Sequence, residues 1–161
     1  IPSVVPVGID QDPHLRLARD VAARFESEYG FILPSSTYNR LMPGLTGKKM
    51  SSSSPKSAIF LTDSMRDVRR KIGDAVTGGR HTVEEQKEKG GKPDECMIYG
   101  LYAYHLMPDD ELLELRKACE SGEIICGECK EKARDLMESF LEEHREKREE
   151  SEQIVEKIAE E

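Results

Sequence analysis

The sequence contains no tryptophan, few aromatic residues and no long apolar stretch. Aromatic side chains account for 6% of its 161 residues. Its stretches without charge, such as Ile1 to Ile9 and Met97 to Met107, are far shorter than the ~18 apolar residues that a membrane-spanning helix needs. We therefore expect no membrane-spanning helix and no membrane partner.

A secretory signal is also lacking. The residues up to Ile9 include no lysine or arginine, and the polar residues Asp10, Gln11 and Asp12 follow, so the basic beginning of a signal peptide is absent. The expected location is the cytoplasm. Because the sequence opens with Ile1 rather than methionine, we also expect it to be a piece of a longer protein.

Positive charge is scarce overall but unevenly distributed. The net charge of -8 argues against a nucleic-acid partner, because phosphate binding needs lysine and arginine. Basic residues nevertheless outnumber acidic ones from Arg66 to Lys92, whereas acidic residues dominate from Lys130 to Glu161. One face is therefore expected to attract polyanions while the far end repels them.

The N-terminal part has the pattern of a strand, a tight turn and a helix. A β-branched run from Ile1 to Gly8 predicts a buried strand, and residues 11–29, with Asp10 or Asp12 as cap and Gly30 as the stop, predict a helix. A weaker strand is predicted at 37–42. In α/β sheets ligands bind beyond the carboxyl ends of the strands, so a site is expected at the turn after Gly8.

After about Thr62 the pattern becomes helical. Helices are predicted over residues 63–73 with Asp63 as cap, from the Thr82 cap to Gly90, and over 94–107, 109–121 and 127 to about 158. The expected fold class is α/β followed by an all-α region.

The loop over residues 43–55 is rich in glycine and serine and contains the string Lys49-Met50-Ser51-Ser52-Ser53. Glycines free the backbone, Lys49 offers a flexible cation, and the serines offer hydroxyl and amide groups, which together are the parts of a mobile phosphate clamp. Composition alone also describes a solvated linker, so the order of the residues decides the interpretation.

That order resembles the Lys-Met-Ser-Lys-Ser motif of class I aminoacyl-tRNA synthetases, a loop that holds the pyrophosphate of ATP during amino-acid activation. A second string, Gly8-Ile9-Asp10-Gln11, resembles the Gly-x-Asp-Gln turn of the tyrosyl and tryptophanyl subclass. The continuation from Asp12 to Ala22, the serine at position 52, and the strings at 59–63 and 77–85 are similar to tryptophanyl enzymes of archaeal and eukaryotic type.

The resemblance implies a fold, a reaction and site residues. Residues 1 to about 62 are expected to be the C-terminal half of a Rossmann nucleotide-binding fold, and residues 63–161 the helical domain that receives the tRNA anticodon. The implied reaction forms tryptophanyl adenylate from tryptophan and ATP with Mg²⁺ and then transfers tryptophan to tRNA(Trp). Lys49, Ser51 and Ser53 are expected to stabilise the leaving pyrophosphate. The residues expected to bind ATP and the amino acid are Gly8, Ile9, Asp10, Gln11 and Met50.

One element of this family is missing from the sequence. The His-x-Gly-His string, which binds ATP from the other half of the nucleotide fold, does not occur. The chain therefore carries about half of an active site. We expect it to be inactive alone and to need the N-terminal half of the same enzyme, and the family implies a homodimer for the complete protein.

Four cysteines fall at the ends of predicted helices: Cys96, Cys119, Cys126 and Cys129. They are compatible with buried apolar positions or with a metal site, whereas disulfides are not expected in a cytosolic protein. Helix N-termini lower thiol pKa values, and one Cys-x-x-Cys pair is present. Some tryptophanyl-tRNA synthetases carry a 4Fe-4S cluster on this arrangement, so the resemblance implies such a cluster on all four thiolates, with zinc as the alternative.

Two other functions fit parts of the sequence. One is a truncated, non-catalytic relative that binds RNA or a metal, and a start codon at Ile1 rather than a longer upstream reading frame would indicate it. The other is a tyrosyl-tRNA synthetase, which is disfavoured by Asp12-Pro13-His14 and by the string from Thr77 to Glu85.

Overall fold

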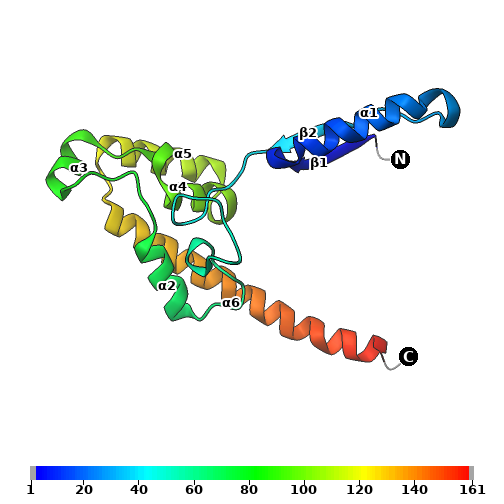
Figure 1. Cartoon of the computed structure of the whole chain (residues 1–161). Coiled ribbons are helices and arrows are strands. Elements are labelled where there is room, and N and C mark those ends of the chain that lie inside the picture. Colours follow the sequence, from blue (N-terminus) through cyan, green and yellow to red (C-terminus); the bar gives the residue numbers. More distant parts are fainter. Residues whose placement is uncertain (1–2, 160–161) are drawn as a thin grey trace. The chain divides into compact units, whose positions relative to one another are not determined.

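The computed structural model describes residues 3–159, which form a mixed fold of helices and strands (Figure 1). The chain divides into two compact units, of which the first ends at Leu41 and the second begins at Met42. This boundary precedes the Lys49 loop, so the loop belongs to the helical unit. In the described part of the chain, no helix combines the length and the apolar character needed to cross a membrane.

The first unit consists of two parallel strands joined by a helix. Strand β1 (Val4–Gly8) is followed by a single 3-10 turn (Ile9–Gln11), helix α1 (Asp12–Tyr29) and strand β2 (Ser35–Asn39). The register pairs Val4 with Ser35 and Gly8 with Asn39, so the carboxyl ends of both strands lie at one edge. The predicted strand end at Gly8 and helix end at Tyr29 are confirmed, and Gly30 adopts the left-handed conformation (φ 61°) that ends the helix. The expected strand residues Ile1 and Pro2 lie outside the described part.

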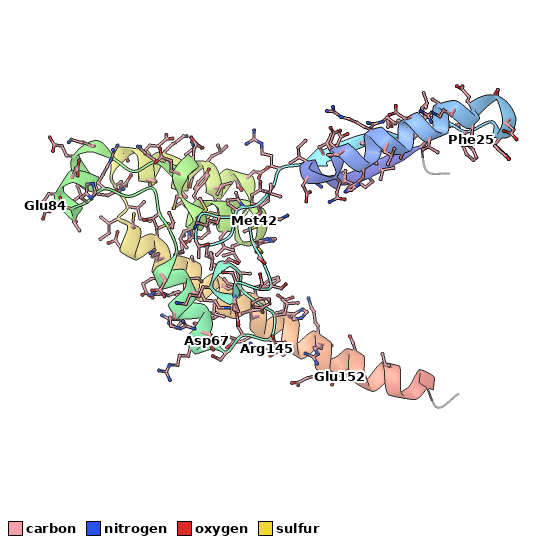
Figure 2. All side chains as sticks on the ribbon, viewed as in Figure 1. Phe25, Met42, Asp67, Glu84, Arg145 and Glu152 are labelled. Carbon is pink, nitrogen blue, oxygen red and sulfur yellow. The ribbon has the colours of Figure 1, made fainter. Side chains whose placement is uncertain are left out.

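The prediction that the first strand is buried is wrong for this chain. Val4 is 53% exposed, and Phe25 on α1 is exposed as well (Figure 2). The cause is that β1 pairs with one neighbouring strand and that the sheet has two strands. Strand β2 begins at Ser35 and ends at Asn39, so both of its ends come earlier in the sequence than those of the predicted range 37–42.

The second unit is helical. Its α-helices are α2 (Met65–Asp74), α3 (Val83–Lys89), α4 (Met97–Leu101), α5 (Asp109–Ser121) and α6 (Cys126–Ala159). Short 3-10 helices occupy Pro55–Ser57 and Pro93–Glu95, and a π-helical turn occupies Tyr102–Leu106. The predicted helix over 109–121 is confirmed, and the Thr82 hydroxyl caps α3 by accepting a hydrogen bond from the Glu85 amide (3.1 Å).

Two predictions in this unit are wrong. Residues 94–107 do not form one helix, because Cys96 has an extended backbone (φ -100°, ψ 118°) and itself caps α4, its sulfur accepting from the Tyr99 amide. Asp63 does not cap α2. The Ser64 hydroxyl does so by accepting from the Asp67 amide (3.1 Å), and the Asp63 carboxylate is engaged elsewhere.

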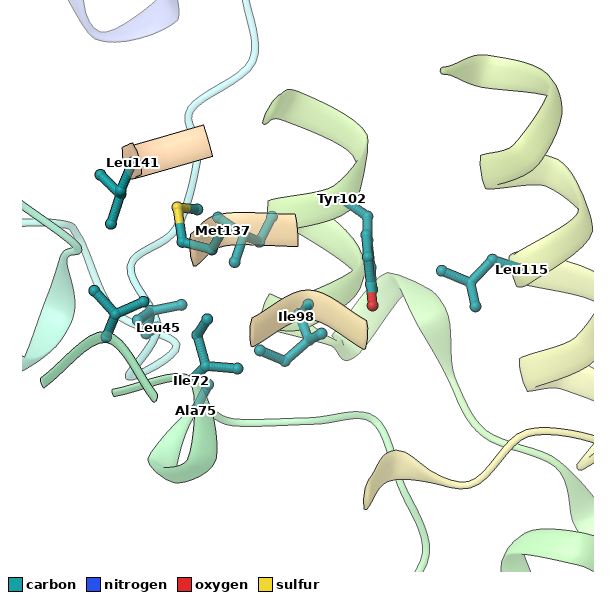
Figure 3. Packing of buried hydrophobic residues seen from close by; sticks show 11 residues of the cluster. Leu45, Ile72, Ala75, Ile98, Tyr102, Leu115, Met137 and Leu141 are labelled. Carbon is teal, nitrogen blue, oxygen red and sulfur yellow. The ribbon is translucent and has the colours of Figure 1, made fainter. Parts of the chain in front are cut away.

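One apolar core joins α2, α4, the π-helical turn, α5 and α6 (Figure 3). The buried members are Leu45, Val68, Ile72, Ala75, Ile98, Leu101, Tyr102, Leu115, Ala133, Met137 and Leu141. The loop residue Leu45 belongs to this core, and it therefore fastens the segment that carries Lys49 to the helices.

Replacing Leu141 by alanine is expected to lower the free energy of unfolding of the helical unit by about 2–5 kcal/mol, because the side chain is 0% exposed and its loss leaves a cavity. Leu113, which is 57% exposed, is the matched control, and Leu113→Ala should change stability by less than about 0.5 kcal/mol. Denaturant unfolding followed by circular dichroism measures both. Equal losses in the two variants would contradict the assigned core.

Candidate functional site

The turn after β1 presents its polar side chains to solvent. Ile9, Asp10 and Gln11 are exposed, and Gly8 is half-buried at the end of the strand. A Cβ atom at Gly8 would lie 2.7 Å from Asp10 Oδ1, so the glycine leaves the space into which this carboxylate folds. The prediction that Asp10 or Asp12 caps α1 is wrong, since the cap residue is Gln11 and its side chain makes no capping hydrogen bond.

Asp12 instead ties the beginning of α1 to β2. Its carboxylate accepts hydrogen bonds from the Tyr38 hydroxyl (2.6 Å) and from Arg16 (2.6 Å). The Tyr38 hydrogen bond, supported by Arg16, holds the pKa of Asp12 below its usual value. Arg19 adds hydrogen bonds to Pro34 O (2.8 Å) and to the Ser36 hydroxyl (2.7 Å). These contacts fix the turn, and no sequence motif indicated them.

The Lys49 loop closes on itself at its base. The Leu45 carbonyl accepts a hydrogen bond from the Val76 amide (2.9 Å), and the Leu45 amide donates to Ser57 O (2.9 Å). Pro43 and Lys49 form an antiparallel β-bridge. A Cβ atom at Gly44 would lie 2.5 Å from Ser57 O, so this close approach requires glycine. The loop is thus a closed structure held at both ends rather than an open linker.

Ser57, in the 3-10 helix that follows the loop, holds the loop together through its hydroxyl, and sequence reasoning missed it. Its side chain is 1% exposed, accepts a hydrogen bond from the Ser51 amide (3.0 Å) and donates to Ser54 O (2.7 Å). The Ser51 and Ser53 hydroxyls lie 2.8 Å apart, so the structure brings these two predicted residues together. Among several serines so close in the sequence, nothing in the sequence shows which hydroxyl is buried.

Lys49 and Met50 stand at the exposed rim of this loop. Both side chains are exposed, and the Lys49 ammonium makes no hydrogen bond or ion pair with the side chains that the structure describes, which leave out 1–2, 153–154 and 156–161. A cation on a fixed backbone with no internal partner is available to an anionic ligand. Gly8 to Gln11 belong to the first unit, and Lys49 to Ser53 belong to the second.

Lys71 anchors the segment that follows the loop. Its buried ammonium donates to Ala58 O (2.9 Å), pairs with Asp63 (2.6 Å) and lies 4.8 Å from the centre of the Phe60 ring. This lysine was counted among the basic residues expected to attract polyanions. The structure shows that it has an internal role, and Arg69 is likewise paired with Glu138 (2.7 Å) on α6.

Replacing Ser57 by alanine is expected to lower the free energy of unfolding of the helical unit by about 1 kcal/mol, because the buried hydroxyl and its hydrogen bonds to the Ser51 amide and the Ser54 carbonyl are lost. Ser52, which is exposed, supplies the control, and Ser52→Ala should be close to neutral. Denaturant unfolding measures the change. A neutral Ser57→Ala would show that the hydroxyl does not hold the loop.

All four cysteines line one small cavity in the helical unit. They are free thiols from three places: Cys96 before α4, Cys119 near the end of α5, and the pair Cys126 and Cys129 in the first turn of α6. Apolar side chains complete the lining together with two glycine segments, at 78–79 and 91.

Glycines make room for these sulfur atoms. A Cβ atom at Gly79 would lie 2.5 Å from Cys126 Sγ, and one at Gly91 would lie 2.8 Å from Cys119 Sγ. Either distance is too short for a real Cβ contact, so two turns that carry no side chain form part of the wall. Such a cradle, with four thiols facing it, fits a group that sulfur ligands hold.

In the described range no three His, Cys, Asp or Glu side chains converge closely enough to hold a single metal ion. Zinc requires its sulfur ligands about 2.3 Å from one ion. Each iron of a 4Fe-4S cluster takes one thiolate.

The expectation of a lowered thiol pKa at a helix N-terminus is wrong for Cys129. Burial, followed by the negative charge of the neighbouring cysteines, raises the pKa of Cys129 to about 12. Burial also raises the pKa of Cys119 above its ordinary value. Loss of hydration on burial is the largest cause of both shifts.

The chain is similar to proteins of one known family. The model of the class I tRNA synthetase family for tryptophan and tyrosine matches residues 2–142. A tryptophan–tRNA ligase from Methanocaldococcus jannaschii is 56% identical over 160 residues, covering 99% of this chain and 43% of the relative. The crystal structure of tryptophanyl-tRNA synthetase from Aeropyrum pernix has a TM-score of 0.88 at 51% identity, covering 96% of this chain and 42% of that one.

A tyrosyl-tRNA synthetase structure from Aeropyrum pernix has a TM-score of 0.69 at 22% identity, and it covers 87% of this chain and 42% of that one. At this identity the likeness concerns the fold alone. The chain spans less than half the length of each of these relatives.

Proposed function

The chain belongs to the class I tRNA synthetases of the tryptophan and tyrosine family, and from this premise we propose that it is part of a tryptophan–tRNA ligase. High identity to archaeal tryptophan–tRNA ligases along almost the whole chain carries the proposal. The reaction joins tryptophan to ATP, releases pyrophosphate, and passes the tryptophanyl group to tRNA(Trp).

In this proposal the Lys49 loop binds the phosphates of ATP. Lys49 supplies a positive charge to the pyrophosphate as it leaves, and Ser51 and Ser53 supply hydroxyl groups. The exposed, unpartnered ammonium and the fixed loop base support this role, because a charge held ready costs little reorganisation during the reaction. Mg²⁺ accompanies ATP as part of the substrate.

The turn after β1 binds the remainder of the adenylate. The Asp10 carboxylate accepts hydrogen bonds from ribose hydroxyls or an ammonium group, and the Gln11 amide both donates and accepts. Gly8 and Ile9 offer backbone N–H and C=O groups to the ligand, and the Met50 side chain offers an apolar contact from the loop. Exposure of Asp10 and Gln11 at the carboxyl end of a parallel strand supports this role.

The other half of the nucleotide-binding fold is proposed to pack on the first unit. An open apolar groove lies there, lined by Val5, His14, Leu15, Leu17, Ala18, Val21, Ala22, Phe31 and Pro34. Two strands and one helix bury little of this surface, whereas further strands would cover it and complete a Rossmann sheet. The partner we assign to this face is the half of the same enzyme that carries His-x-Gly-His, and the complete enzyme is proposed to be a homodimer.

Residues 63–161, which begin after the Lys49 loop, are proposed to receive the anticodon of tRNA(Trp), and the proposed location is the cytoplasm. We further propose that Cys96, Cys119, Cys126 and Cys129 hold a 4Fe-4S cluster in the helical unit. The shared cavity and the two glycine walls support a group held by these four thiols. When bound, the cluster supplies four iron–sulfur bonds that clip the beginnings of α4 and α6 to the end of α5.

Tryptophan-dependent exchange of pyrophosphate into ATP tests the proposed reaction. The chain alone should be inactive, and a mixture with a polypeptide that carries the His-x-Gly-His half of a tryptophan–tRNA ligase should be active with tryptophan but not with tyrosine. Exchange by the chain alone would contradict the assignment of half a site. Exchange with tyrosine would favour the tyrosyl enzyme, and no exchange in the mixture would favour a non-catalytic module that binds RNA or a metal.

A further inference from the structure

A single buried amide in the helical unit lacks a partner. Gln86, on α3, is 3% exposed, and its Oε1 accepts a hydrogen bond from the Arg80 amide (2.9 Å). Its Nε2 is the one buried side-chain nitrogen or oxygen without a hydrogen bond in the part of the chain that the structure describes. Because the Arg80 N–H requires an oxygen opposite it, the orientation of the amide is fixed and the NH₂ group points the other way.

The unpartnered NH₂ group faces the cysteine cavity. Gln86 lines this cavity together with the four cysteines. A Cβ atom at Gly91 would lie 2.7 Å from Gln86 Nε2 and 2.8 Å from Cys119 Sγ, so the amide nitrogen and the sulfur border the same small space. On the other side, a Cβ atom at Gly79 would lie 2.5 Å from Cys126 Sγ and 3.5 Å from Gln86 Oε1. The amide therefore lies beside two of the four thiols.

The surroundings leave sulfur as the main acceptor for this donor. The rest of the cavity lining is largely apolar, with Ile98, Ile124 and Ile125 among its members. Thr77 also lines the cavity, and neither its hydroxyl nor any other described group accepts a hydrogen bond from this nitrogen. Buried donors in native proteins are normally satisfied, so an unpaired NH₂ group beside four thiols indicates a ligand that accepts a hydrogen bond.

From this geometry we infer that Gln86 Nε2 donates a hydrogen bond to a sulfur atom of the proposed cluster, beside Cys119. This inference rests on the proposed 4Fe-4S site. Hydrogen bonds to the sulfurs stabilise the more negative, reduced state of such a cluster and so raise its reduction potential. Gln86 is thus a positioning residue that orients the cysteine cradle and sets the potential, and it contributes no ligand to iron.

The test uses the full chain reconstituted with iron and sulfide without oxygen. The chain has three glutamines, Gln11, Gln86 and Gln153, of which Gln86 alone lines the cavity among the described residues. Protein labelled with ¹⁵N in its glutamine side chains is reduced, and pulsed electron paramagnetic resonance measures nitrogen coupling to the cluster. Coupling is expected in the unsubstituted protein.

Two variants separate the hydrogen bond from charge. Gln86→Leu removes the donor without adding charge, and Gln86→Glu keeps an oxygen for Arg80 but has no NH₂ group. Both should show a more negative midpoint potential, and Gln86→Leu should lose the nitrogen coupling. A lower potential in Gln86→Glu alone would overturn the inference, because charge would then explain it.

The labelled, unsubstituted protein keeps the inference testable if a variant fails to fold. A cluster without nitrogen coupling overturns the role of Gln86 and leaves the proposed cluster standing. Failure of the unsubstituted chain to bind iron at all overturns the proposed cluster and the inference together.

Discussion

Replacing Lys49 by alanine is expected to lower the rate of tryptophan activation in the assembled enzyme by about 10²- to 10³-fold, while tryptophan binding changes little. The magnitude is that of removing one preorganised group that stabilises charge developing in a transition state. Lys49 fits this role because its backbone is bridged to Pro43 and its ammonium makes no ion pair with the side chains that the structure describes. The activation rate and the tryptophan dissociation constant, measured separately, check the prediction.

Lys48 provides the matched control. It is an adjacent, exposed lysine of equal charge, so Lys48→Ala removes the same charge from the same loop. Its activation rate should remain close to that of the unsubstituted enzyme. Equal losses of rate and of tryptophan affinity in Lys49→Ala would contradict the assigned role, as would an equal effect of Lys48→Ala.

The second large effect is expected from Cys129→Ser. After anaerobic reconstitution, iron content should fall from about four atoms per chain to nearly none, and brown colour with absorption near 400 nm should disappear. Serine has nearly the shape of cysteine but is a poor ligand for this cluster, so loss of coordination and not of packing is tested. Iron analysis and absorption spectra give the result.

Tyr102→Phe is the control for packing around this cysteine. The Tyr102 hydroxyl donates to Cys129 O (2.7 Å), so phenylalanine disturbs the same place and keeps all four thiols. This variant should retain its iron. Iron-free and zinc-free protein in the absence of oxygen, before any substitution, would contradict the metal site itself, and stoichiometric zinc would favour the alternative.

Sequence reasoning succeeded where neighbouring residues decide the structure. The strand end at Gly8, the stop at Gly30, the Thr82 cap and the helix over 109–121 all depend on groups within a few positions of one another. Their backbone hydrogen bonds and dihedral preferences are local, so the sequence carries the information directly.

It failed where distant residues compete for the same groups. Asp63 does not cap α2 because Lys71 holds its carboxylate. The helix expected over 94–107 breaks at Cys96 and widens into a π-helical turn at Tyr102, whose hydroxyl donates a hydrogen bond to Cys129 O on α6. These outcomes depend on tertiary packing, which overrides local preference.

The candidate sites show the same division. The motifs predicted Lys49, Ser51 and Ser53 in one loop, yet Ser57, which holds that loop together, resembles any other serine in the sequence. Likewise, spacing drew attention to the cysteines, whereas Gln86 becomes visible only when loops from several parts of the chain surround it.

The central claim is that the turn after β1 and the Lys49 loop bind one and the same nucleotide. A crystal structure of the assembled enzyme with a non-hydrolysable analogue of tryptophanyl adenylate tests it most directly. The account predicts one analogue with ribose hydroxyls bonded to Asp10 and the phosphate-mimicking group near Lys49. An analogue bound with either residue on the opposite side of the protein would contradict it.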